Sequence, residues 1–413
     1  MSPGLTLAPG RRARGAVQLP GSKSLSNRLL LLASMCSQPT ELPGLLQADD
    51  VQVCQAALRE LGHQVDGHRV CPGVWKSKAT LWLGNAGTAV RPLVAILSGQ
   101  TGVFELDGEP RMRERPLGPL LDALRRWGAE IEELGQTGFL PLRIHGRTLK
   151  GGPNWVDASL SSQYASALLM AAPRFLGPSQ LELRGQVVSR PYIDLTLAQM
   201  QLFGVKVTDL AVPSQAYQSP GLVYVEGDAT AASYFLAAGA LGGGPVRILG
   251  AGSTSLQSEL RFAHYLEQMG AHLKWGPDWV EVSQGRGPLR GISCDLNELP
   301  DAAMTLAVVA LFAEGVTEIR GVANWTIKEC DRQDALFCEL TKVGAHVEKL
   351  PDGIRIVPPQ DWRPATVETY QDHRMAMCFS LLTFSPVQVH LLDPGCVSKT
   401  YPGYFQDLDS ILC

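Results

Sequence analysis

Residues 324–332 read N-W-T-I-K-E-C-D-R and concentrate side chains that could do chemistry. Four of the nine are charged, with both signs present: Lys328, Glu329, Asp331 and Arg332. The stretch follows a predicted buried strand (316–319) and precedes a predicted amphipathic helix (335–343). Opposite charges clustered at such a junction suit an anionic substrate and proton transfer. Taken alone, the stretch also fits a solvated helix start with ion pairs three or four residues apart.

A second chemistry-bearing stretch, residues 19–28, reads L-P-G-S-K-S-L-S-N-R. It predicts a turn of small residues followed by a helix over 27–33. Because a helix N-terminus has free amides, the added hydroxyls and Lys23 make this a natural anion site. Ser24 and Arg28, four residues apart, can share one helix face. The pattern is not a Walker motif.

Residues 83–91, L-G-N-A-G-T-A-V-R, repeat this arrangement after a predicted strand at 80–83. Asn85 and Gly87 lie in the predicted turn, and a glycine lets a ligand approach the backbone closely. Residues 108–116 then place three arginines within five residues, a composition that suits bidentate contact with carboxylate or phosphate. These are Arg111, Arg113 and Arg115.

Further polar groups stand in shorter stretches along the chain, some of which open predicted helices. Their hydroxyl and amide members are Ser161, Ser162, Gln163, Ser189 and Tyr192. Their charged members are Asp228, Asp301, Asp372, Arg374 and Lys399. Capping of a helix explains a single Ser or Asp at such a position. Two serines followed by Gln163 exceed what capping needs.

Composition limits the function classes. A chain of 413 residues exceeds what one core usually serves, so we expect two domains. The net charge of −4 argues against non-specific nucleic-acid binding. The longest apolar runs (29–35 and 302–313) are too short to span a membrane, and we expect no signal peptide. Nine cysteines without C-x-x-C or zinc-type spacing favour reduced thiols, no metal and a cytoplasmic protein.

One pattern recurs along the chain: an apolar residue, two mostly polar ones, an apolar residue, Gly, two more residues and an apolar residue. Its glycines are Gly62, Gly128, Gly204, Gly270 and Gly344. Each copy predicts the end of a helix, a glycine stop and then a strand. A spacing of about 70 residues fits roughly six times into the chain, which predicts six α/β units in two sets of three.

In order, these stretches resemble the motifs of the 5-enolpyruvylshikimate-3-phosphate synthase (3-phosphoshikimate 1-carboxyvinyltransferase) family. The motifs span nearly the whole chain. They are P-G-S-K-S-x-S-N-R (20–28), G-N-A-G-T-A-x-R (84–91), R-M-x-E-R-P (111–116), S-S-Q (161–163), E-G-D (226–228), P-D-A-A-M-T (300–305), N-W-x-x-K-E-x-D-R (324–332), D-H-R-M-A-M (372–377) and K-T (399–400). Departures at Thr326, Gln333 and Gln371 put local packing and rate in question rather than reaction type.

The resemblance implies an α/β fold of two inside-out domains, each of three repeated units, with the active site in the cleft between them. Residues 1–19 and 228–413 would form the first, discontinuous domain, and residues 20–227 the second. The family transfers the enolpyruvyl group of phosphoenolpyruvate to the 5-hydroxyl of shikimate 3-phosphate, releasing phosphate, in aromatic amino-acid (chorismate) biosynthesis. No cofactor or metal is implied, and we expect a monomer.

The resemblance also assigns ligand residues. Shikimate 3-phosphate would be held by Lys23, Ser24, Arg28, Ser161, Ser162, Gln163, Ser189, Tyr192, Asp301, Asn324 and Lys328. Phosphoenolpyruvate would be held by Lys23, Asn85, Gly87, Arg115, Gln163, Arg332, Arg374 and Lys399. The inhibitor glyphosate occupies the phosphoenolpyruvate site in this family, and Gly87 predicts a sensitive enzyme.

Addition and elimination need one base and one proton donor with distinct protonation states. We expect Asp301 to take the hydroxyl proton and Glu329 to protonate the methylene, with Lys23 assisting. Two alternatives stay open. Transfer to a UDP-amino sugar is typical of a related family, whose active-site loop carries a reactive Cys that residues 111–116 lack. A ligand-binding relative without catalysis would not need both carboxylates.

Overall fold

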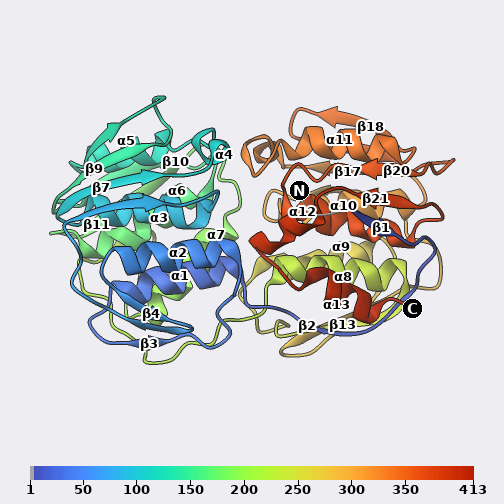
Figure 1. Ribbon diagram of the computed structural model, residues 1–413, viewed down its shortest axis with the longest axis horizontal. Helices are drawn as coiled ribbons and strands as arrows, with labels where there is room; N and C mark the ends of the chain where they lie inside the picture. Colours follow the sequence, from blue (N-terminus) through green and yellow to red (C-terminus); the bar gives the residue numbers. More distant parts are fainter. Residues whose placement is uncertain (1–3) are drawn as a thin grey trace. The chain divides into compact units, whose positions relative to one another are not determined.

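The computed structural model describes residues 4–413. The chain folds into two compact units (Figure 1). Unit 1 combines the N-terminal segment up to Pro20 with Glu226–Cys413, and unit 2 is Gly21–Val225. These limits lie one and two residues from the crossings expected after residues 19 and 227.

Both units are built from small sheets, and the described residues form three sheets in each. The strands of unit 2 are β3 (Thr40–Glu41), β4 (Gln64–Asp66), β5 (Arg69–Cys71), β6 (Lys78–Trp82), β7 (Gly102–Asp107), β8 (Glu130–Glu133), β9 (Leu142–Gly146), β10 (Gly152–Asp157), β11 (Ser179–Arg184) and β12 (Ala211–Val212). Those of unit 1 are β1 (Leu5–Leu7), β2 (Ala13–Gln18), β13 (Gly243–Leu249), β14 (His272–Trp275), β15 (Trp279–Ser283), β16 (Ser293–Asp295), β17 (Thr317–Arg320), β18 (His346–Leu350), β19 (Gly353–Val357), β20 (Ala365–Val367) and β21 (Val389–Leu391).

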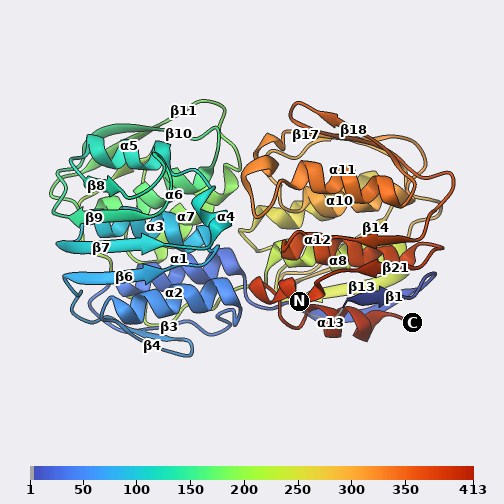
Figure 2. The same ribbon diagram turned by 45° about the horizontal axis from the view of Figure 1, so that its top comes forward.

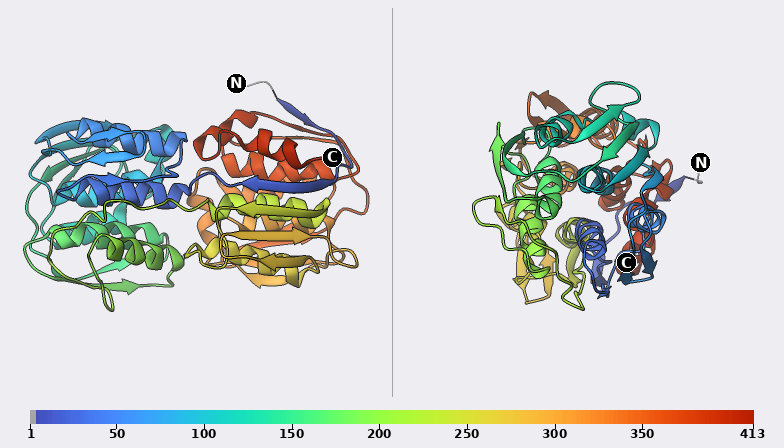
Figure 3. Two further views of the ribbon diagram at one scale, coloured as in Figure 1. Left: turned by 90° about the horizontal axis from the view of Figure 1, so that it is seen from below. Right: turned by 90° about the vertical axis from the view of Figure 1, so that its left-hand side faces the viewer.

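The three four-stranded sheets share one topology, which confirms the predicted repeat. Their orders are β6-β7-β9-β8, β16-β17-β19-β18 and β2-β13-β15-β14. In each, the first two strands pair in parallel and the last two form an antiparallel hairpin. In unit 1 the N-terminal strand β2 completes a sheet with β13, more than 200 residues later in the chain (Figure 3).

Each repeat also contributes helices, of which one is almost wholly buried. The inner helices are α1 (Lys23–Ser34), α3 (Gly87–Ser98), α6 (Ser162–Ala171), α8 (Ala229–Leu241), α10 (Ala303–Val309) and α12 (His373–Phe379). The other helices are α2 (Asp49–Glu60), α4 (Pro110–Arg113), α5 (Gly118–Arg126), α7 (Pro191–Leu202), α9 (Phe262–Gln268), α11 (Arg332–Lys342) and α13 (Tyr404–Ile411). Six short 3₁₀ turns complete the described helical segments: η1 (Ala172–Arg174), η2 (Ser258–Arg261), η3 (Ala310–Phe312), η4 (Ala323–Ile327), η5 (Ser380–Phe384) and η6 (Pro394–Lys399).

Burial separates the two kinds of helix and explains the inside-out arrangement. In α8, 12 of 13 residues are buried, whereas α11 buries only 5 of 11 along one face. A helix that is apolar all round must lie inside a core, and an amphipathic one covers it. In unit 1, α10 contacts both α8 and α12 (Figure 2).

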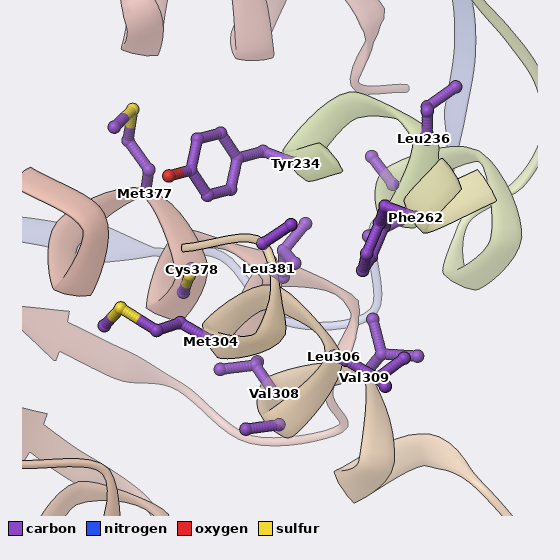
Figure 4. Close-up of a cluster of buried hydrophobic side chains, with 14 of the residues drawn as sticks. Tyr234, Leu236, Phe262, Met304, Leu306, Val308, Val309, Met377, Cys378 and Leu381 are labelled. Atoms are coloured by element: carbon purple, nitrogen blue, oxygen red, sulfur yellow. The ribbon is translucent and has the colours of Figure 1, made fainter. Parts of the chain in front are cut away.

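Each unit has its own hydrophobic core. In unit 1 the inner helices supply Tyr234, Met304, Met377 and Cys378 to one cluster (Figure 4). Such close packing fixes where each inner helix begins, which is where the candidate site residues stand.

The repeated glycines adopt positive φ, between 82° and 110°, as a residue that ends a helix often must. After Gly62, Gly128, Gly270 and Gly344 a strand follows, as predicted. After Gly204 the prediction of a strand is wrong. Asp209 and Leu210 have positive φ and turn the chain, so that β12 rather than residues 205–207 pairs with β11.

Candidate functional site

The guanidinium of Arg332 in unit 1 joins three carboxylates. It donates from Nη1 to Asp301 Oδ1, from Nη2 to Glu329 Oε2 and from Nε to Asp372 Oδ2, each over 2.8 Å. The Arg332 side chain is 1% exposed. Burial lowers its pKa, but Asp372, Glu329 and Asp301 outweigh burial and hold the pKa well above the usual arginine value. Arg332 is therefore a permanent buried cation.

Asp301 is the acceptor at the centre of a cationic cluster. Its Oδ1 lies 3.3 Å from Lys328 Nζ, and its Oδ2 accepts from Arg374 Nη2 over 3.0 Å. Burial raises the pKa of Asp301, but Arg374, Lys328 and Arg332 outweigh it and hold the pKa well below its usual range. The alternative reading of Asp301 as a helix cap is wrong, because α10 begins after Ala302 with no side-chain cap.

The local sequence explains how these side chains converge. The predicted helix over 335–343 begins three residues earlier, because Asp331 caps it by accepting from the Asp334 N–H over 3.1 Å, and Arg332 is thus its first residue. Asp372 caps α12 in the same way, so that Arg374 stands in its first turn. Trp325, fully buried, donates from Nε1 to Pro300 O over 2.6 Å and holds η4 against the segment before Asp301.

Two further expected ligand residues of unit 1 are Asn324 in η4 and Lys399 in η6. Asn324 is 7% exposed, and its Oδ1 has no hydrogen-bond partner among the described residues. A buried acceptor without a partner is costly and suits a ligand donor. Lys399 ends η6.

In unit 2, Lys23 is the first residue of α1 and lies 3.3 Å from Asp50 Oδ2, measured from its Nζ. Both side chains are largely buried, with 9% and 5% exposed. Ser22, rather than a later residue, caps α1 by accepting from the Leu25 N–H. The helix predicted over 27–33 consequently starts at Lys23, and Ser24 and Arg28 both belong to it.

The residues expected around the shikimate phosphate converge from α1 and α7. Arg28 donates from Nη1 to Ser24 O over 2.9 Å and from Nε to Thr196 Oγ1 over 2.8 Å. Its guanidinium lies 5.8 Å from the ring centre of Tyr192. Ser189, 4% exposed and with φ of 53°, precedes α7, and its backbone carbonyl accepts from the Tyr192 N–H over 3.1 Å. The Arg28 guanidinium thus lies beside the Thr196 hydroxyl and the Tyr192 ring.

The second anion group of unit 2 lies at the start of α3. Arg115 donates from Nη1 to Asn85 Oδ1 over 3.0 Å and to Asn85 O over 3.3 Å. A Cβ added at Gly87 would lie 2.3 Å from Arg91 Nη1 and 3.1 Å from Arg115 Nη2. The lack of a side chain at Gly87 therefore leaves room for two buried guanidinium groups.

The serine pair divides its roles. Ser161 caps α6, accepting from the Gln163 N–H over 3.2 Å, whereas Ser162 is the first, buried residue of the helix. Gln163 Oε1 is buried and has no hydrogen-bond partner among the described residues. Capping thus explains Ser161, and the polar groups beyond it are available to a ligand.

Hydrogen bonds hold helix N-termini together within each unit. In unit 2, Asn27 in α1 donates to Thr88 Oγ1 in α3 over 2.6 Å, and Tyr164 in α6 donates to Pro116 O over 2.7 Å. In unit 1, the ion pairs of Asp301 and Arg332 join the starts of α10, α11 and α12. Helix N-termini carry partial positive charge, so the helix starts gathered in each unit suit anions.

Sequence reasoning missed several groups that hold these side chains. Asp50 pairs with Lys23, Thr196 accepts from Arg28, and Tyr234 OH accepts from Arg374 Nη1 over 3.1 Å. Asp50 and Tyr234 stand in no recognisable motif, and in the stretch 189–196 only Ser189 and Tyr192 were expected to supply hydroxyls. The D-H-R motif of residues 372–374 does single out Asp372, although it does not indicate Arg332 as its partner.

Two of the three departures from the family pattern have local partners. Gln333 donates from Nε2 to Leu350 O and to Gly353 O, each over 2.7 Å, and so joins α11 to the β18–β19 hairpin. Thr326 is exposed and donates to Ala323 O over 3.2 Å. Gln371 has φ of 54°.

In the part of the chain from residue 4 onward, no helix is both long and apolar enough to cross a lipid bilayer. The same residues contain no group of three or more His, Cys, Asp or Glu side chains that could hold a metal ion.

The fold, with polar and charged groups gathered at helix starts in each unit, is that of a two-unit α/β enzyme. Residues 7–408 match the model of the EPSP synthase (3-phosphoshikimate 1-carboxyvinyltransferase) family. The chain belongs to this family, as the motifs predicted. It is 49% identical to the 3-phosphoshikimate 1-carboxyvinyltransferase of Bordetella petrii, over 98% of this chain and 96% of the relative. It is also 49% identical to the Shewanella oneidensis enzyme of that name, over 98% of this chain and 99% of the relative.

Solved structures agree on the fold. The EPSP synthase of Acinetobacter baumannii superposes with a TM-score of 0.80 at 23% identity, covering 98% of this chain and 97% of that one. The enolpyruvyl transferase NikO of Streptomyces tendae superposes with a TM-score of 0.78 at 18% identity, covering 99% and 97%. The predicted fold of two inside-out α/β domains, each of three units, is confirmed.

Proposed function

We propose that this chain transfers the enolpyruvyl group of phosphoenolpyruvate to the 5-hydroxyl of shikimate 3-phosphate and releases phosphate. The observation that carries the proposal is the sharing of Arg332 by Asp301 and Glu329. A buried cation that holds two carboxylates close together suits a reaction in which one carboxylate accepts a proton from the substrate and the other donates a proton to it.

The half-site of unit 2 supports binding of shikimate 3-phosphate. Arg28, Ser24 and Ser189 supply charge and hydroxyls for its phosphate, and Ser162 and Tyr192 add donors nearby. Asn324 of unit 1 offers an acceptor without a partner among the described residues to a substrate hydroxyl. The contact of Arg28 with the phosphate would be charge-assisted, and such hydrogen bonds are the strong ones.

Phosphoenolpyruvate would bind to the arginines. Its carboxylate and phosphate would be bound by Arg115, Arg332, Arg374, Lys23 and Lys399. Asn85, which already accepts from Arg115, and Gln163 orient it. The residues proposed for phosphoenolpyruvate derive from both units.

Because the pKa of Asp301 is low, binding of phosphoenolpyruvate would also have to make this carboxylate a better base. In the structure Asp301 accepts from Arg332 and Arg374, and its low pKa makes it a weak base. The carboxylate of phosphoenolpyruvate competes for the same two guanidinium groups. As these donors turn to the substrate, the pKa of Asp301 rises toward the range in which it accepts a proton from the 5-hydroxyl.

Each step balances. In the addition, the O–H bond of the 5-hydroxyl breaks toward Asp301, the oxygen bonds to C2 of phosphoenolpyruvate, and Glu329 donates a proton to C3. In the elimination, Glu329 removes a proton from the new methyl group as the C–O bond to phosphate breaks. Lys23 and the arginines stabilise the negative charge on the departing phosphate, which takes up the proton held by Asp301 and returns that carboxylate to its starting state.

The deciding experiment measures phosphate release from phosphoenolpyruvate with and without shikimate 3-phosphate. Release that requires shikimate 3-phosphate supports the proposal. Release with a UDP-amino sugar in its place would favour the related transferase, and binding without release would favour a non-catalytic relative. Residues 111–116 contain no cysteine, which argues against the UDP-amino sugar.

We further propose that the enzyme acts as a cytoplasmic monomer without nucleic acid. One chain supplies every proposed ligand residue, and its nine cysteines form no disulfide in the described structure. Sedimentation at micromolar concentration tests the monomer, and a larger species would contradict it.

A further inference from the structure

The turn before α12 has an unusual backbone for its residues. The Asp372 N–H donates to Thr369 O over 2.8 Å, and the two residues between them, Tyr370 and Gln371, have φ of 53° and 54°. Positive φ at both central positions is the pattern of a type I′ turn, which Gly, Asn and Asp normally occupy. A bulky residue in this region persists only where its surroundings hold it.

A buried carboxylate on α11 supplies that hold. Glu339 is 0% exposed, and its Oε1 accepts from Tyr370 OH over 2.7 Å. Lys342 Nζ donates to both carboxylate oxygens, over 2.8 and 2.7 Å, and balances the charge. The Glu368 N–H donates to Oε2 over 3.2 Å. Burial and then Glu339 raise the pKa of Tyr370, so its phenol remains a donor at neutral pH.

The turn sets the position of Asp372, which bonds to both Arg332 and Arg374. Asp372, 0% exposed, follows the strained pair directly. Its Oδ1 accepts from the Arg374 N–H over 2.9 Å, and its Oδ2 accepts from Arg332 Nε over 2.8 Å. A change in the turn therefore moves both arginines at once.

We propose that Glu339 and Tyr370 form a positioning pair that sets Arg332 and Arg374 for phosphoenolpyruvate. The inference rests on the function proposed above, in which these arginines bind that substrate. Neither member of the pair is proposed to touch a substrate, so each acts through Asp372. Small misplacements of binding groups cost binding and rate, which makes the pair's geometry measurable in kinetics.

The test compares both substrates in Tyr370→Phe, which loses only the hydroxyl. We expect the KM for phosphoenolpyruvate to rise roughly tenfold, as loss of a hydrogen bond to a charged group would give. The affinity for shikimate 3-phosphate, titrated without phosphoenolpyruvate, should stay within about twofold, because its proposed anchors lie largely in unit 2. Glu339→Gln provides a second variant and should act in the same direction.

Two further variants separate positioning from a general loss of stability. Asp334→Asn removes an exposed ion pair of the same helix, in which Asp334 Oδ1 lies 2.8 Å from Lys349 Nζ. This variant should change neither the KM for phosphoenolpyruvate nor the affinity for shikimate 3-phosphate. Gln371→Asn places a residue that tolerates positive φ in the turn. Added to Tyr370→Phe, it should restore part of the affinity for phosphoenolpyruvate.

The outcomes are distinct. A lower melting temperature with an unchanged KM for phosphoenolpyruvate would make the pair merely structural and overturn the proposal. Equal losses for both substrates would overturn it as well. A wild-type protein that releases no phosphate with both substrates would instead overturn the proposed function, and the positioning role with it.

Discussion

Arg332 and Asp301 form a buried ion pair in unit 1, with 2.8 Å between Nη1 and Oδ1. The same arginine also bonds Glu329 and Asp372, and the same aspartate bonds Lys328 and Arg374. A network of this kind keeps its charges only while every member is paired, since an uncompensated buried charge is expensive. An anionic substrate can enter it by exchange of partners.

Glu329→Gln tests the proposed acid. The amide oxygen can still accept from Arg332, so we expect the affinity for both substrates to change little. Turnover should fall by about 10²–10⁴-fold, the usual contribution of a proton-transfer group. Steady-state phosphate release measures the change, and Glu348→Gln, at an exposed carboxylate of the same unit, is the matched control. Turnover within a few-fold of wild type would remove Glu329 from this role.

Asp301→Asn tests the electrostatics of the cluster through stability. The pKa of Asp301 is depressed in the folded protein, so its contribution is complete above the ordinary carboxyl pKa of about 4 and is lost as the pH falls below it. We expect a lower melting temperature than wild type at pH 7 and a gap that narrows below about pH 4. Thermal unfolding across this range measures it, and a constant gap would contradict the assignment.

Much of this organisation was predictable from sequence, because glycine and capping residues carry local rules. The glycines that follow α2, α5, α9 and α11 indicated helix ends, and their spacing indicated the repeated units. The motifs also indicated that several charged residues lie where helices begin. The strand expected after Gly204 failed because the same local signal was overridden by the turn at Asp209 and Leu210.

The pairings inside the site were not predictable, because they join residues far apart in the chain. Asp50 meets Lys23, Tyr234 meets Arg374, and Glu339 meets Tyr370. Nothing in the local sequence of Tyr370 and Gln371 favours positive φ. Only the packed fold, in which α11 lies against β20 and the segment that follows it, supplies the partner that holds them.

Binding of both ligands should bring the two units together. The proposed ligand residues derive from both, and closure that excludes water would protect a reactive intermediate. We expect a smaller radius of gyration in small-angle scattering with shikimate 3-phosphate and phosphoenolpyruvate than without them. An unchanged radius at saturating ligand would count against closure.

Gly87→Ala tests the crowding at the start of α3. The new methyl group would lie 2.3 Å from Arg91 Nη1 and 3.2 Å from Arg115 Cζ, so the guanidinium groups must move. We predict that the wild type is inhibited by glyphosate in competition with phosphoenolpyruvate. The substitution should weaken the longer inhibitor more than the substrate, by about 1–3 kcal/mol or roughly 5- to 150-fold.

The inhibition constant and the KM for phosphoenolpyruvate are measured with saturating shikimate 3-phosphate in both proteins. Gly118→Ala is the matched control, because it also stands first in a helix of unit 2, yet its Cβ would meet nothing nearer than 3.9 Å. The control should change neither constant. Because the methyl displaces arginines as well as ligand, the KM should rise too, though by less than the inhibition constant. Equal rises would mean that the methyl acts only through Arg91 and Arg115, and a tolerant wild type would contradict the predicted sensitivity.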